Sequence, residues 1–302
     1  MNRRPPAAVR RALRREVGYG CPVSGCGRPY LVWHHFDPPW ADQHHHNPEG
    51  MIALCRDCHD DADAGAYTKD QLREMKKSGG SRKEVVAGEF RWRRNRLLTF
   101  VGGQFHYEVR YPLVVRDEGP LIWFNRDEDG CFLLNVRWPR FVDLRGFLME
   151  DNYWLLPQEP QDVVCPPSGR SLSLIYDNNR RFSVKFEEVG DYDVLCRRFV
   201  EPNIGRDQFL SLISMPVTIV ELSYVISDWQ FELTSRGSGF ADQLQLMPGG
   251  VFMNGEVGIQ IDPGFFRPPP GWQPPTNFRL LRWELGDSVS SLYSEIANDG
   301  AE

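Results

Sequence analysis

The chain of 302 residues lacks several features that mark common protein classes. No apolar stretch approaches the roughly 20 residues that a membrane-spanning helix needs, so we expect no association with a membrane. The N-terminal segment is basic but has no apolar signal core, which predicts a protein that stays in the cytoplasm. Seven cysteines are too few and too unevenly spaced for a secreted disulfide scaffold. With 41% hydrophobic residues, the chain can still build substantial cores.

Histidine is scarce outside one short window. Six of the seven histidines lie between residues 34 and 59. An imidazole can ligate a metal, accept a proton or serve as an ordinary buried polar group, so its neighbours must decide its role. His34 and His35 follow an apolar run, and His59 directly follows a cysteine pair. His44, His45 and His46 are interpreted as a solvated loop, with contact to phosphate or metal as the alternative, and the isolated His106 is interpreted as structural.

Four of the seven cysteines form two close pairs. Cys21 is followed by Cys26 after four residues, and Cys55 is followed by Cys58 after two. Two such pairs are the usual means of placing four thiolates around Zn²⁺. We therefore predict a structural zinc that stabilises a unit too small to hold itself together. The remaining three cysteines stand alone.

Charge and residue pattern divide the chain into two parts. Residues 1–100 carry 18 Lys and Arg against 12 Asp and Glu, whereas residues 101–302 carry 17 against 29. The basic part suits a polyanion such as nucleic acid, while the acidic part opposes phosphate. Helical character stops near 78–88, where strand-like alternation begins. We predict an α+β protein with a small domain at 1–80 and a larger, mainly β domain at 88–302.

Local signals place several elements in the N-terminal part. Residues 5–19 begin with prolines and have apolar residues one turn apart, which predicts a helix. Its other faces carry arginines that we expect to contact nucleic acid, although a solvated basic surface is the alternative: Arg10, Arg11, Arg14 and Arg15. Residues 50–55 predict a strand, and the segment from Arg56 predicts a helix with His59 on its first turn. Thr68 and Gln71 form a capping box that starts a further helix.

The rest of the sequence is typical of β structure. Residues 121–138 and 171–186 contain hairpin turns, and Gly102-Gly103 separates two further strand-like runs. The proline-rich segment 263–275 predicts an extended loop, and 286–298 predicts a short C-terminal helix.

In residues 18–78 the chain resembles the HNH endonucleases of the ββα-metal, or His-Me finger, class. The histidine pair, Asn47, "LC" and "CxxCH" occur in the family's order, with the cysteine pairs where zinc-containing members have theirs. The resemblance implies a small ββα-metal domain in which His35 is the general base and Asn47 fixes the loop that bears it. His34 and His59 would then ligate one catalytic divalent metal.

The metal itself is left open by one departure from the commonest pattern. Most family members have aspartate where this chain has His34, although colicin-type nucleases share the paired histidines. An imidazole ligand makes Zn²⁺, Ni²⁺ or Mn²⁺ as plausible as Mg²⁺. Asp63 lies four residues after His59 on the same helix face and is a candidate third ligand, with an ordinary surface carboxylate as the alternative.

The function that we expect is metal-dependent hydrolysis of phosphodiester bonds, with duplex DNA as the substrate. This chemistry needs a water deprotonated near neutral pH and a cation beside the phosphate oxygens, and imidazole with a metal supplies both. We expect the β domain to recognise a substrate, a regulatory partner or a second copy of the chain. Bacterial or phage defence is a setting inferred by analogy alone. The alternatives are an RNA nuclease, a zinc-dependent nucleic-acid-binding module without catalysis, and a sensor with a vestigial nuclease.

Overall fold

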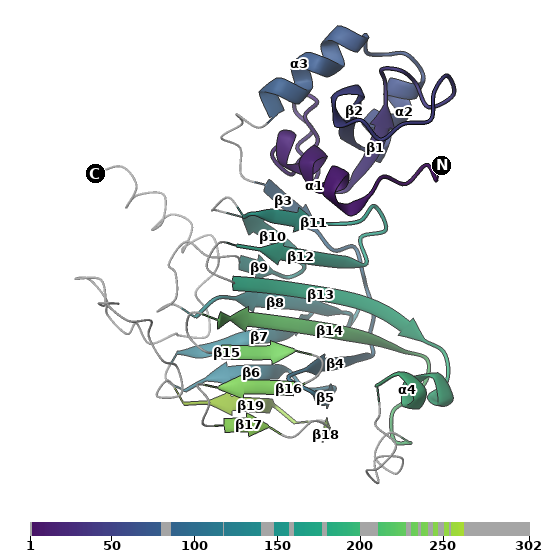
Figure 1. The fold of residues 1–302 in the computed structure, drawn as a ribbon. Helices are drawn as coiled ribbons and strands as arrows, with labels where there is room; N and C mark the ends of the chain where they lie inside the picture. The colour runs from purple at the N-terminus through teal and green to yellow at the C-terminus, as the bar shows by residue number, and fades with distance from the viewer. Residues whose placement is uncertain are drawn as a thin grey trace, which may run out of the picture. The chain divides into compact units, whose positions relative to one another are not determined.

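The chain folds as two compact units in a computed structural model (Figure 1). The first unit combines Met1–Phe90 with Leu155–Tyr176, and the second combines Arg91–Trp154 with Asp177–Glu302. The architecture is mixed α+β, mostly β-sheet with few helices. The structure describes residues 2–79, 86–116, 118–139, 148–156, 160–176, 180–199, 211–227, 231–234, 237–240, 244–246, 251–253 and 255–262.

The first unit is built on a two-stranded antiparallel sheet. Strands β1 and β2 pair so that His34 faces Ile52 and His35 faces Met51 across the ladder. Helix α2 follows β2 without a connecting loop. The elements of this unit are α1 (Ala7–Glu16), β1 (Leu31–His35), η1 (Pro48–Gly50), β2 (Met51–Cys55), α2 (Arg56–Asp63), α3 (Lys69–Gly79), β3 (Val86–Glu89), β11 (Asp162–Val164) and β12 (Ser171–Ile175).

Local sequence signals account for these helices. The prolines before α1 suit a helix start, and Leu13 and Val17 are buried as their spacing predicted. At the start of α3, Thr68 N–H donates to Gln71 Oε1 (2.8 Å) and Gln71 N–H donates to Thr68 Oγ1 (3.2 Å), which confirms the capping box.

Every residue of β2 is buried, so this strand is the centre of the first unit's core.

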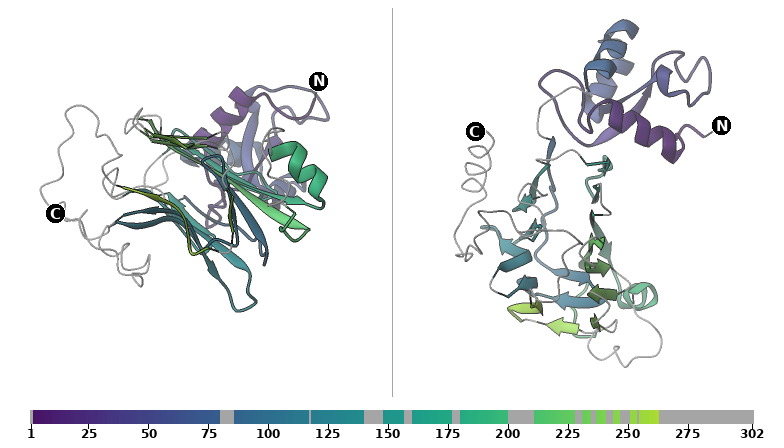
Figure 2. Two further views of the ribbon diagram at one scale, coloured as in Figure 1. Left: turned by 90° about the horizontal axis from the view of Figure 1, so that it is seen from below. Right: turned by 60° about the vertical axis from the view of Figure 1, so that its left-hand side comes forward.

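The second unit is a β-sandwich. Figure 2 shows its two sheets stacked as two layers. In one sheet the strand order is β19-β6-β7-β8-β9, and in the other it is β13-β14-β15-β16-β17. Helix α4 (Tyr192–Phe199), which the sequence did not predict, follows β13. The strands are β4 (Leu97–Val101), β5 (Gln104–Tyr107), β6 (Tyr111–Val115), β7 (Gly119–Arg126), β8 (Phe132–Arg137), β9 (Leu148–Glu150), β13 (Arg180–Val189), β14 (Val217–Ile226), β15 (Phe231–Thr234), β16 (Gly237–Phe240), β17 (Leu244–Leu246), β18 (Val251–Met253) and β19 (Val257–Ile261); β10 (Tyr153–Leu156) crosses the division between the units.

Two predicted hairpins are confirmed. Gly102 and Gly103 have φ values of 60° and 73° and form the two-residue turn between β4 and β5, a conformation that favours glycine. Strands β7 and β8 pair around the turn that contains Gly130, whose φ is 74°. The third predicted hairpin spans residues 171–186. Residues 171–175 and 180–186 of it are strands, but the turn at residues 177–179 lies outside the described residues. The segments 263–275 and 286–298 also lie outside them.

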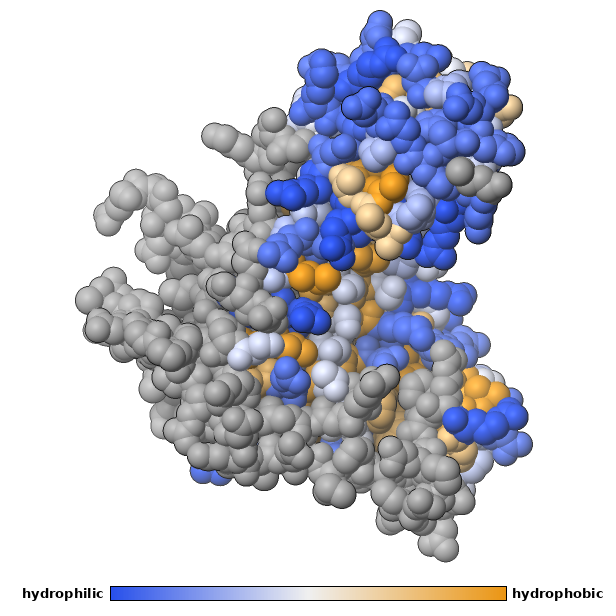
Figure 3. Space-filling view, viewed as in Figure 1, coloured by the Kyte–Doolittle hydropathy of each residue, from blue (hydrophilic) through white to orange (hydrophobic). Residues whose placement is uncertain are grey.

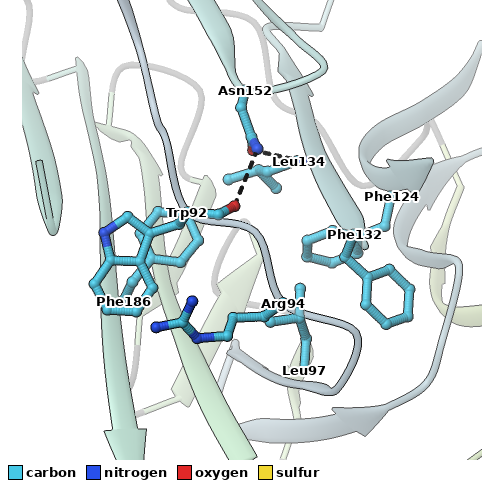
Figure 4. A pocket seen from close by; sticks show the side chains of 8 residues that line it. All are labelled: Trp92, Arg94, Leu97, Phe124, Phe132, Leu134, Asn152 and Phe186. Atoms are coloured by element: carbon cyan, nitrogen blue, oxygen red, sulfur yellow. Dashed lines mark hydrogen bonds between the residues drawn. The ribbon is translucent and has the colours of Figure 1, made fainter. Parts of the chain in front are cut away.

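Side chains fill the space between the two sheets of the second unit. A pocket there is lined by Trp92, Arg94, Leu97, Phe124, Phe132, Leu134, Asn152 and Phe186 (Figure 4). The Arg94 guanidinium lies over the Trp92 ring, 4.8 Å from its centre, and the lining leaves no room for a water molecule. The Arg94 side chain is 43% exposed and extends to the surface of the second unit. Among the described helices, none has the length and apolar character needed to cross a membrane.

The domain division differs from the simple split at residues 80–88. Residues 80–85 of that boundary lie outside the described residues. Leu155–Tyr176, which the sequence analysis assigned to the β domain, belongs to the first unit and supplies its β11–β12 hairpin.

Candidate metal centre

The four paired cysteines converge on one point of the first unit. Their sulfur atoms all lie within 4.8 Å of one another, and Cys26 Sγ is 3.5 Å from Cys55 Sγ. Cys55 ends β2 and Cys58 lies in the first turn of α2, so the strand-to-helix junction supplies one pair. Thiolates bound tetrahedrally to Zn²⁺ lie about 3.8 Å apart. The spacing of the four cysteines therefore fits a structural zinc ion.

The electrostatics of these thiols also suit a bound cation. Burial raises the pKa of Cys21 to about 12, and burial followed by the neighbouring sulfurs raises the pKa of Cys58. Burial also raises the pKa of Cys26, but hydrogen bonds from the Arg28 backbone and the other thiols outweigh it and lower that pKa overall. Four close thiols cannot all ionise without a positive charge between them, and a divalent cation supplies that charge.

A second group that could bind metal lies where β1 meets α2. His34 Nδ1 is 3.1 Å from Asp63 Oδ1, and His59 Nδ1 is 3.4 Å from Asp63 Oδ2. The three ligand atoms lie within 4.8 Å of one another. Burial lowers the pKa of His34, His59 lowers it further, and Asp63 opposes both. His34 is therefore neutral at neutral pH, which is the form that ligates metal.

His35 lies apart from this group, because successive residues of a strand point to opposite faces. Its ring packs 4.8 Å from the Trp40 ring, 5.3 Å from His45 and 6.0 Å from His46. Burial, with smaller effects from His45 and His46, lowers the pKa of His35 to about 4. The His45 backbone opposes this shift by raising the pKa of His35. Its approach is not a full hydrogen bond, because neither ring nitrogen of His35 has a partner with hydrogen-bond geometry.

Asn47 acts at a turn rather than directly on the residues after His35. Its side-chain oxygen accepts from Glu49 N–H (3.2 Å) and caps η1, the turn that ends at Gly50. The carbonyl oxygen of Gly50 then accepts from the N–H groups of Phe36 (2.9 Å) and Asp37 (3.2 Å). The backbone of Gly50 thus holds the segment that follows His35, and Asn47 shapes the turn that positions Gly50.

The four arginines of α1 have different surroundings. Arg14 is buried, and its Nε and Nη2 donate to the two carboxylate oxygens of Asp162 at 2.9 and 2.7 Å. Arg11 Nε also reaches Asp162, at 3.2 Å, but its side chain is 64% exposed. Arg10 is half-buried and Arg15 is exposed. Arg14 is therefore engaged in the fold, whereas the side chains of Arg10, Arg11 and Arg15 are at least partly exposed.

The sequence analysis did not single out three residues that shape this region. Trp40 packs against His35 from five residues further along the chain, and an aromatic residue so near the histidine pair was a usable signal. Gly50, the first residue of the predicted strand, was a weaker signal; the observed strand β2 begins one residue later, at Met51. Asp162 carries no local signal, because its partner Arg14 lies 148 residues away.

In comparisons with protein-family models, curated proteins and solved structures, no match to this chain was found. The side chains and their geometry therefore carry the functional argument.

Proposed function

We propose that the first unit is a metal-dependent endonuclease of the HNH type that hydrolyses phosphodiester bonds of DNA. The observation that supports this most is the convergence of His34, His59 and Asp63 from β1 and α2, with a neutral histidine next along β1. The order of two antiparallel strands followed by a helix agrees with the ββα arrangement of that class. The four cysteines fit the structural zinc of its zinc-containing members.

His34, His59 and Asp63 would hold the catalytic cation, since their separations suit ligands about 2.0–2.2 Å from one ion. When bound, a divalent cation there would neutralise charge on the phosphate oxygens. His35 takes a proton from the attacking water, whose oxygen bonds to phosphorus while the opposite P–O bond breaks. The lowered pKa of His35 leaves its ring unprotonated at neutral pH but also weakens it as a base, so a hydrated site with a higher pKa would suit this step better.

Three arginines of α1 give this unit its contact with the polyanion. Arg10, Arg11 and Arg15 remain accessible, and the face of the first unit that Figure 3 displays is mostly hydrophilic. We assign them to phosphate contacts, which add affinity without sequence preference. The second unit would choose or regulate the target.

One observation favours a second candidate, a nucleic-acid-binding module without catalysis. Both ring nitrogens of His35 are buried, so water must gain access before this residue can act. That candidate predicts binding of nucleic acid without cleavage in the presence of any metal.

The experiment that tests the proposal incubates the purified protein with supercoiled plasmid and single-stranded RNA in Mg²⁺, Mn²⁺, Ni²⁺ or Zn²⁺. We expect His35→Ala to bind DNA but lose cleavage by about 10²-fold or more at every metal concentration, because no metal replaces a proton acceptor. His34→Ala and Asp63→Asn should instead be rescued in part by added metal, through mass action. The matched control is Asp61→Asn on an exposed position of α2, which should cleave normally.

Full cleavage by His35→Ala, or equal rescue of the His34 and His35 variants by metal, would reject this assignment of roles. Binding of nucleic acid without cleavage in all four metals would favour the binding module.

A further inference from the structure

A stack of aromatic rings lies on the segment between His35 and η1. The Trp40 and His44 rings are 4.4 Å apart with an angle of 18° between their planes. Trp40 and His46 are 5.6 Å apart with an angle of 24°. Such near-parallel planes at short separation are stacked rings rather than a random contact. We call Trp40, His44 and His46 the ring stack.

The segment that carries the ring stack is fixed at several points. Asp37 forms an ion pair with Lys69 of α3 (2.8 Å) and another with Arg73. Within the segment, His45 Nε2 lies 2.9 Å from the carbonyl oxygen of Pro38, and Asn47 N–H donates to His45 Nδ1 (3.1 Å). The ring stack is therefore preorganised, which reduces the entropy that a ligand must lose on binding.

The ring stack begins next to the proposed general base. The Trp40 ring is 4.8 Å from the His35 ring, and His44 stacks on Trp40. Trp40 is half-buried while His44 is exposed, so the stack ends in a flat ring that faces solvent. A nucleotide whose base contacted that ring would hold its phosphodiester close to His35.

We infer that His44 stacks with an unpaired nucleobase and that the substrate of the first unit is therefore single-stranded nucleic acid; this inference rests on the proposed nuclease function. Every base has a flat π face, so stacking of this kind binds bases with little sequence preference. In an intact duplex both faces of an internal base are covered by its neighbours. A single-stranded segment or a frayed end presents a base to His44 without the cost of unstacking it from a duplex. The duplex DNA expected from the sequence would then be cut mainly where its strands separate.

The test compares cleavage of a fluorescein-labelled single-stranded oligonucleotide with cleavage of the same strand carrying abasic sites and of its perfect duplex. For the intact strand we expect His44→Ala to raise KM about tenfold, because stacking on one ring contributes on that scale. His44→Phe keeps a flat ring without a nitrogen and should stay within about twofold of the parent protein. Gln43→Ala, an exposed residue of the same segment without a ring, is the matched control.

The abasic strand separates stacking from other roles of His44. If the ring stacks on a base, the abasic strand has a raised KM in the parent protein, and His44→Ala adds nothing further. An equal KM for both strands, an unchanged KM in His44→Ala, or preferential cleavage of the duplex would overturn the inference and leave the nuclease proposal intact.

Absence of cleavage for every substrate and metal would instead reject the proposed function. Fluorescence anisotropy then decides whether His44 stacks. A Kd for the intact strand that rises about tenfold in His44→Ala supports stacking, and an unchanged Kd overturns it.

Discussion

At the scale of single residues, the sequence allowed us to predict which side chains could form the two candidate metal sites, but not the surroundings of those side chains. Cysteine pairs and clustered histidines are informative because few other arrangements explain them. Strand alternation separates the neighbouring residues His34 and His35. The burial of His35 against Trp40 depends on the path of residues 36–47, which no local pattern specifies. The hydrogen bonds to Gly50 O were equally unpredictable, because a backbone carbonyl has no sequence signature.

We predict that Gly50→Ala displaces the segment that follows His35 and lowers cleavage. A Cβ atom at Gly50 would lie 1.9 Å from the carbonyl oxygen of Asp37 and 3.0 Å from His45 Cε1, so the backbone must shift. Because a displacement of about 1 Å can cost up to 10²-fold in rate, we expect kcat to fall by about tenfold or more.

The control for this variant is Gly190→Ala, where an added Cβ meets nothing within 4 Å. The zinc content and melting temperature of Gly50→Ala should be measured together with kcat, because retained zinc with reduced kcat separates misplacement from unfolding. A kcat equal to that of the parent protein would contradict the role given to Gly50.

At the scale of elements, the helices and hairpins that were predicted have strong local signals, although one such signal was overlooked. The reciprocal bonds of Thr68 and Gln71 and the positive φ values of Gly102 and Gly103 are local requirements that the sequence states directly. Helix α4 does have such a signal, because Asp191 Oδ1 accepts from Val194 N–H (2.9 Å) and caps its first turn, yet this helix was not predicted. The parallel pairing of β4 with β14 joins residues far apart in sequence, and such pairing depends on tertiary packing rather than on local propensity.

The junction of β2 with α2 gives a prediction at this scale. Cys55→Ser should reduce the bound zinc from about one ion per chain to a small fraction and lower the melting temperature of the first unit, because the thiolate cage contributes folding free energy. Elemental analysis of the purified protein and calorimetry measure both effects. As a control, Cys131→Ser replaces a lone cysteine of the second unit, and this variant should bind as much zinc as the parent protein. Purified parent protein without zinc would count against the structural site.

At the scale of the whole molecule, the first unit is not continuous in sequence. The β11–β12 hairpin is flanked on both sides by chain that belongs to the second unit, yet it completes the first. The carboxylate of Asp162 accepts hydrogen bonds from the side chains of Arg14 and Arg11. In addition, Tyr19 OH donates to the carbonyl oxygen of Gln161 (2.7 Å). Composition and periodicity describe local stretches of chain, so they could not assign this hairpin to the N-terminal unit. A fragment that ends near residue 90 would lack the partner of a buried charge.

The Arg14–Asp162 pair therefore gives the prediction that tests this organisation. Asp162→Ala should destabilise the first unit by about 3–5 kcal/mol, because it leaves the buried Arg14 guanidinium without a counter-charge. Urea denaturation, monitored through hydrogen exchange of the β1 and β2 amides, measures this loss of stability within the first unit. As a control, Glu188→Ala removes the partner of Arg94 from an exposed pair (side chains 53% and 43% exposed) and should change stability by less than about 1 kcal/mol.

The double variant Arg14→Met with Asp162→Leu distinguishes the loss of a buried charge partner from the loss of packing. An apolar pair of similar volume removes the unpaired charge, so the double variant should recover most of the stability that Asp162→Ala loses. If Asp162→Ala unfolds at the same urea concentration as the parent protein, the hairpin is not required by the first unit. A fragment of residues 1–90 should then fold and bind zinc alone. If the loss and its recovery are both observed, the hairpin is a required part of the first unit, although chain that belongs to the second unit separates it from α1.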